Sequence, residues 1–109
     1  MKPAREERLQ ARLRQAWVEA RTLVAERMRV LEVAVSAANS GALGQEQRSS
    51  AIAAAHKLSG SLGVFGLREA SFCARNIEEQ FYAGCCDAGT LAPMLQRVQQ
   101  LLRNYEDAG

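Results

Sequence analysis

The chain has 109 residues, 48% of them hydrophobic, and a formal net charge of +2 at pH 7. This length suits a single domain spanning residues 1–109, with enough apolar side chains to form a core. The charge is close to neutral and the basic residues are interspersed with Glu, which argues against a nucleic-acid partner, and no apolar run is long enough for membrane insertion.

The first predicted element is a long helix over about residues 3–38. Pro3 suits its first turn, where the missing N–H has no intrahelical partner. Asn39, Ser40 and Gly41 favour the end of the helix, because such residues tolerate a left-handed backbone. Apolar residues recur at steps of three and four and predict one buried stripe: Leu9, Leu13, Ala16, Trp17, Ala20, Leu23, Val24, Met28, Leu31 and Val35.

Three more amphipathic helices follow, over about 45–62, over about 67–83 and from Thr90 onward. Residues 63–66, Gly-Val-Phe-Gly, form the predicted turn between the second helix and the third. Thr90 is the expected N-cap of the last helix, with Pro93 in its first turn. Because short connections make neighbouring helices antiparallel, the sequence predicts an all-α, up-down-up-down antiparallel four-helix bundle with a long N-terminal helix.

His56, the only histidine, lies in the second predicted helix. At about 100° per residue, four apolar side chains of this helix fall opposite His56 and point into the bundle: Ala51, Ala55, Leu58 and Leu62. Small residues predominate among those expected on the face of His56: Ser49, Ile52, Ser59, Gly60 and Gly63. We therefore expect the imidazole to project into solvent from a surface with little bulk.

Gly60, one turn after His56, is the most informative of these neighbours. A glycine inside a helix costs about 1 kcal/mol relative to alanine, so something should compensate for it. Close approach of a second protein to the imidazole is one explanation. The alternative is that Gly60 lets another helix of the bundle pack closely.

An exposed imidazole is well suited to phosphoryl transfer. It is largely neutral at cellular pH, so a ring nitrogen is a nucleophile without a separate base. Lys57 is a candidate to balance phosphate charge, or else an ordinary solvated lysine, and Ser59 and Ser61 are candidate hydrogen-bond donors. The sequence has neither a glycine-rich nucleotide loop nor paired metal ligands, so we expect no intrinsic cofactor or metal. We expect a phosphate carrier without kinase or phosphatase activity of its own.

The segment 55–67, Ala-His-Lys-Leu-Ser-Gly-Ser-Leu-Gly-Val-Phe-Gly-Leu, followed by Ile77-Glu78, resembles the signature of histidine phosphotransfer (HPt) domains. That signature has a phosphorylated His, an apolar residue two positions later, Gly four and ten positions later, then Leu, and a Leu-Glu pair one helix on. The matching positions are His56, Leu58, Gly60, Gly66 and Leu67, with Ile77-Glu78 in place of the Leu-Glu pair. One departure is that the family often has Lys three residues after the His, where this chain has Ser59.

The resemblance implies a four-helix bundle that exchanges phosphate, at His56, with the aspartate of a response-regulator receiver domain. It also implies a hybrid histidine kinase as a further partner, and Mg²⁺ that is brought by the receiver domain. The third-helix residues Arg68 and Arg75 are expected to contribute weakly to docking. The expected docking surface is centred on His56, Lys57, Ser59, Gly60 and Gly63.

Two other functions remain open from the sequence. The turn at 63–66 also resembles the phosphate-accepting domain of chemotaxis-type histidine kinases, which receives phosphate from ATP through a separate kinase domain. A helical interaction module, in which His56 is incidental, is the other alternative, and the long first helix favours it.

The cysteines, Cys73, Cys85 and Cys86, are odd in number and match no zinc-binding spacing. We expect reduced, buried thiols in a cytoplasmic protein, and a thiol-based redox sensor is a remote alternative.

Overall fold

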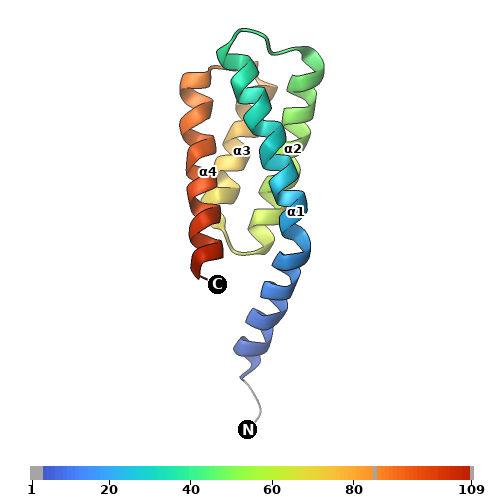
Figure 1. Cartoon of the computed structure of the whole chain (residues 1–109), viewed down its shortest axis with the longest axis vertical. Helices are drawn as coiled ribbons and strands as arrows, with labels where there is room; N and C mark the ends of the chain where they lie inside the picture. Colours follow the sequence, from blue (N-terminus) through green and yellow to red (C-terminus); the bar gives the residue numbers. More distant parts are fainter. Residues whose placement is uncertain (1–3, 85, 109) are drawn as a thin grey trace.

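The computed structural model describes residues 4–84 and 86–108, which form four helices joined by short connections (Figure 1). The helices run alternately up and down, as predicted. None of the described helices is both long enough and apolar enough to cross a membrane. The helix bounds are α1 (Arg5–Asn39), α2 (Gln45–Val64), α3 (Arg68–Tyr82) and α4 (Ala88–Ala108).

Each helix packs against two neighbours, so that α1, α2, α3 and α4 form a closed ring around one core. The diagonal pairs do not share an interface. The largest side chains that are completely enclosed in this core come from all four helices: Leu31, Leu58, Leu62, Ile77, Phe81, Leu91 and Val98.

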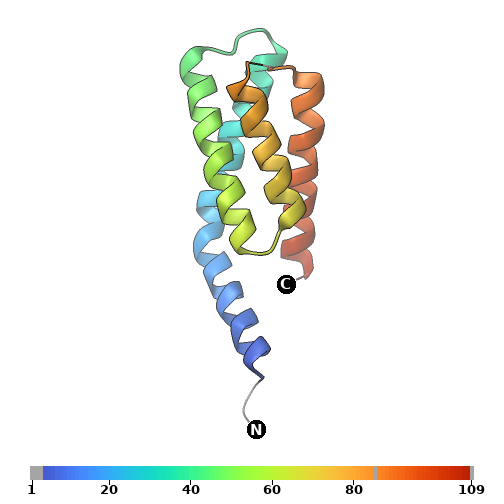
Figure 2. The same cartoon turned by 180° about the vertical axis from the view of Figure 1, so that it is seen from behind.

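The first turns of α1 extend past the ends of the other three helices (Figures 1 and 2). The predicted apolar stripe is therefore buried only in part, and the prediction was also wrong for Leu23, which is 44% exposed because it lies about 100° around α1 from the buried Val24. Trp17, Val24 and Leu31 are buried, whereas Leu9 remains exposed and Leu13 meets only the C-terminal end of α4 and is 38% exposed. Pro3 lies outside the described residues.

The buried sides of α2 and α3 carry many small side chains. We refer to these four residues, all at most 1% exposed, as the alanine seam: Ala51, Ala55, Ala70 and Ala74. Helix separation depends on the side chains at the contact, so methyl groups let two helices approach closely. The alanine seam thus favours a tight pairing of the two helices that carry the His56 region.

Three helix ends, those of α1, α2 and α3, are closed by glycines with a left-handed backbone, and the third of these is Gly84 with φ +79°. At the end of α1, Gly41 has φ +69° and Ala42 N donates to Ala37 O at 2.8 Å. At the end of α2, Gly66 has φ +75° and Leu67 N donates to Leu62 O at 3.0 Å. The ends of α1 and α2 are Schellman motifs, in which the carbonyls of the last turn find donors.

Two predicted boundaries were wrong by less than one turn. Residues 63 and 64 belong to α2, so the turn to α3 is shorter than predicted. Thr90 is not the N-cap of α4, because the helix begins at Ala88 and the side chain of Asp87 accepts a hydrogen bond from Gly89 N at 3.0 Å. Pro93 is consequently in the second turn rather than the first.

Arg48 on α2 satisfies two carbonyls at the C-terminal end of α3. Its Nε donates to Phe81 O at 2.6 Å and its Nη2 to Tyr82 O at 2.8 Å. These are charged hydrogen bonds to a helix terminus that carries partial negative charge. We expect Arg48→Met to lower the free energy of unfolding by about 1–3 kcal/mol in urea denaturation. Arg29→Met, at an exposed site on α1, is the control, and equal losses from both substitutions would contradict this role.

Candidate functional site

His56 stands on the outer surface of α2, near the middle of the helix. Its side chain is 75% exposed. The four apolar residues predicted to lie on the opposite side of the helix are all 0% exposed: Ala51, Ala55, Leu58 and Leu62. The predicted orientation of the imidazole is therefore confirmed.

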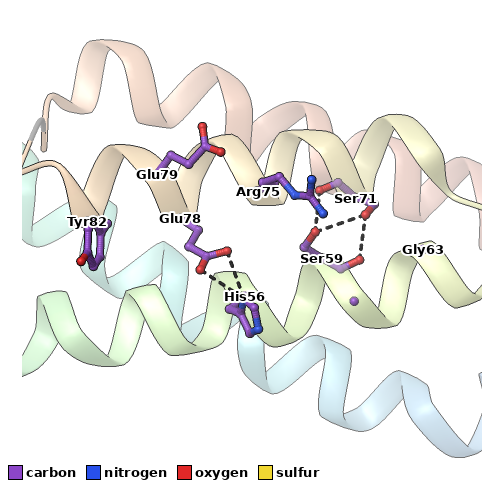
Figure 3. Close-up of a pocket in the computed structure, with 9 residues that line it drawn as sticks. His56, Ser59, Gly63, Ser71, Arg75, Glu78, Glu79 and Tyr82 are labelled. Atoms are coloured by element: carbon purple, nitrogen blue, oxygen red, sulfur yellow. Dashed lines mark hydrogen bonds and ion pairs between the residues drawn. The ribbon is translucent and has the colours of Figure 1, made fainter.

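Glu78 on α3 contacts the imidazole. The His56 Nδ1 atom lies 3.1 Å from Glu78 Oε2 and 3.3 Å from Oε1, and the Glu78 side chain is 25% exposed (Figure 3). An ionised carboxylate only accepts hydrogen bonds, so Nδ1 carries the hydrogen in this contact. The lone pair of a neutral ring then resides on Nε2.

A groove of about 790 Å³ lies beside the ring, between α2 and α3. Figure 3 shows its walls, with His56 on one helix and Glu78 and Arg75 on the facing one. Its lining residues are His56, Ser59, Gly60, Gly63, Ser71, Arg75, Glu78, Glu79 and Tyr82.

The two glycines of α2 leave the space around this groove open. A Cβ added at Gly60 would meet no atom within 4 Å, and one added at Gly63 would meet only Ser71 Oγ at 3.6 Å. Gly60 therefore does not serve a close contact between helices of this bundle. The space that it leaves empty faces outward, on the same surface as His56.

Ser59 does not share that exposed surface, and this prediction was wrong. Its side chain is buried, at 6% exposure, and its Oγ donates to Ser71 O at 3.0 Å. Ser71 Oγ in turn donates to Ser59 O at 2.8 Å. Helical periodicity places Ser59 about 60° from His56 around α2, on the side that α3 covers, and the facing serine supplies its partners. Ser61 is likewise engaged elsewhere, with Arg27 Nη1 at 3.1 Å.

The basic residues predicted near the site are divided between two environments. Lys57 and Arg68 are exposed and do not line the groove. Arg75 does line it, together with His56. The structure thus brings one of the three predicted cations into the groove.

The described cysteines lie away from the groove. Cys73 and Cys86 are half-buried free thiols, and Cys85 is outside the described residues. Burial, with a further contribution from Glu69, raises the pKa of the Cys73 thiol. A raised pKa is the opposite of what an activated thiol requires.

Glu78 is the contact that residue spacing alone did not reveal. It appeared in the sequence only as the second residue of the Ile77-Glu78 pair. The sequence did contain a signal for this contact: Glu78 lies on the helix that follows the helix of His56. Because the two helices are antiparallel, the chain returns to the same level of the bundle.

A scan against protein-family models matched the model described as "Hpt domain" over residues 6–108, nearly the whole chain. Searches with the chain matched no curated protein and no solved structure. The family match, the four-helix architecture and the HPt signature agree. The chain belongs to the Hpt domain family.

Proposed function

We propose that His56 accepts a phosphoryl group from the aspartyl phosphate of a receiver domain and donates it to another, in a cytoplasmic phosphorelay. Hpt domains act in phosphotransfer in two-component signalling, and this chain is one of them. The observation that carries the assignment to His56 is the 75% exposure of a side chain whose Nδ1 is held by a carboxylate.

The step requires little chemistry from this chain. Nε2 of His56 attacks phosphorus, the Nε2–P bond forms, and the bond from phosphorus to the aspartate oxygen breaks, which leaves a carboxylate on the receiver. Phosphoryl transfer depends mainly on positioning and charge neutralisation, and the receiver brings the Mg²⁺ that supplies much of the latter. This chain contributes an imidazole that Glu78 holds in one orientation on the surface of α2, with open space around it.

Glu78 has a positioning role in this proposal. Its contact with Nδ1 favours the tautomer in which Nε2 has the free lone pair, and it stabilises the positive charge that the ring gains during attack. The docking surface centred on His56, Gly60 and Gly63 extends across the groove to α3. Lys57 stands at its edge, and Ser59 supports it from beneath through Ser71.

The test is to incubate the protein with a receiver domain labelled on its aspartate. We expect acid-labile, alkali-stable label to appear on the protein, and mass spectrometry at neutral pH to place it on His56. Absence of label with a panel of receivers would favour the interaction-module alternative. Label that appears only with ATP and a separate kinase domain would favour the chemotaxis-type alternative.

Replacing Glu78 with alanine is expected to slow phosphoryl acceptance about tenfold, the lower end of what loss of a histidine-orienting partner costs. The affinity for the receiver domain should change much less, because Glu78 acts through the ring. Single-turnover transfer rates at saturating receiver measure this, and ¹⁵N spectra of the imidazole report the tautomer. The control is Glu79→Ala, the next carboxylate on α3, which lines the same groove but forms no hydrogen bond or ion pair with His56 among the described residues. Equal rates for the two variants would contradict the positioning role.

A further inference from the structure

The cation nearest to the groove comes from α3 rather than from the helix that carries His56. Two cross-helix contacts fix the register: Glu78 meets His56, and Ser71 meets Ser59. Arg75 lies between these two residues on α3, about 4.5 Å along the helix axis from Glu78 and about 6 Å from Ser71. Its side chain lines the same groove as the imidazole, and Figure 3 shows it between Glu78 and Ser71.

The Arg75 guanidinium is not committed to a carboxylate. Glu78 is engaged with His56, and Glu69 is engaged with Arg97. Within residues 4–84 and 86–108, no carboxylate oxygen lies within 4.0 Å of Arg75. An exposed guanidinium with no carboxylate partner among the described residues, in the groove that His56 also lines, is free to meet an incoming anion.

Lys57 is less favourably placed, although it is adjacent to His56 in sequence. Ser59 faces α3, and Lys57 lies two residues earlier, about 160° away around α2. Lys57 therefore points away from the groove, which agrees with its absence from the groove lining. Ser59 itself carries no charge and is bound to Ser71.

We propose that Arg75 is the residue of this chain that neutralises the phosphoryl group on Nε2 of His56; this rests on the proposed function of that histidine. A phosphoryl group carries up to two negative charges on three oxygens. The planar guanidinium donates two parallel N–H···O hydrogen bonds to such a group and keeps its positive charge at all relevant pH values. Arg75 thus stabilises the phosphorylated form and shifts the transfer equilibrium toward it.

The direct measurement uses the isolated protein. Phosphoramidate transfers its phosphoryl group to Nε2: the P–N bond to ammonia breaks, the Nε2–P bond forms, and ammonia leaves. A ³¹P NMR titration then gives the pKa of the phosphoryl group on His56. We expect Arg75→Gln to raise that pKa by about 0.5–1 pH unit, because a nearby positive charge favours the more negative form. Lys57→Gln should move it by less than about 0.2, and Arg75→Lys should retain most of the wild-type value.

A second readout is the equilibrium with a phosphorylated receiver domain. Arg75→Gln should shift it toward the receiver by about three- to tenfold, the factor that corresponds to 0.5–1 pH unit. A merely structural role would not move the titration, and circular dichroism checks the fold of each variant. If the pKa of the phosphoryl group were the same in Arg75→Gln as in the wild type, or if only Lys57→Gln shifted it, the assignment of Arg75 would be overturned.

The two proposals fail in different ways. If phosphoramidate labels His56 but no receiver does, the relay function fails while the titration still decides the role of Arg75. If receivers label His56 and the Arg75 variants behave as wild type, only the role of Arg75 fails. If neither donor labels His56, both proposals are overturned.

Discussion

Substitution of His56 by glutamine is expected to abolish phosphoryl acceptance, with a loss of at least about a thousandfold in transfer rate, as for removal of a catalytic nucleophile. Glutamine keeps a polar group near Glu78, but its amide nitrogen has no available lone pair. Because the side chain is 75% exposed, the free energy of unfolding should change by no more than about 0.5 kcal/mol. The rate at which label passes from a labelled receiver to the protein measures the first quantity, and urea denaturation measures the free energy of unfolding.

The receiver should still bind the His56→Gln variant, since the groove and its glycines are unchanged. Binding measured by calorimetry with an unphosphorylated receiver provides the control. Label that persists at the wild-type level in this variant would mean that another residue carries the phosphate, and the proposed function would have to be abandoned.

Gly60→Gln is expected to have opposite effects on stability and on function. Nothing lies within 4 Å of a Cβ at this position, so the fold accommodates the side chain, and replacing a glycine inside a helix should add about 0.5–1 kcal/mol of stability. The same side chain would occupy space beside His56 that an approaching receiver needs. Loss of a close near-attack geometry of this kind costs about a hundredfold in rate.

Gly60→Ala is the matched variant, since it adds the helix-stabilising Cβ without the bulk. We expect it to be as stable as Gly60→Gln while it transfers phosphate much faster. Thermal unfolding and single-turnover transfer of the three proteins test this. If Gly60→Gln accepted phosphate at the wild-type rate, the glycine would have no part in clearing the approach to the ring.

Periodicity predicted the features of this bundle that depend on one helix at a time. The burial of Leu58 and Leu62 and the exposure of His56 follow from about 100° per residue, because each concerns which side of α2 faces the core. The glycine ends at Gly41 and Gly66 were also readable, since a left-handed residue there is a local requirement.

Features that depend on a second helix were not predictable in the same way. Ser59 lies at the border of the exposed surface, and whether it is covered depends on how closely α3 approaches and on Ser71 opposite it. Leu9 and Leu13 continue the apolar stripe of α1, but its burial depends on the length of the other helices. The start of α4 depended on Asp87, whose carboxylate closes that helix in place of the hydroxyl of Thr90.

The alanine seam makes the His56 site sensitive to substitutions at buried positions that do not contact the imidazole. A long side chain can adopt another rotamer when its surroundings change, whereas a methyl group has none to adopt. A bulkier residue at Ala55 or Ala74 would therefore be accommodated by displacing the α3 backbone, and both Glu78 and Arg75 would move away from the imidazole with it. Substitutions with no direct contact to His56 should thus weaken both its tautomer control and its charge balance together.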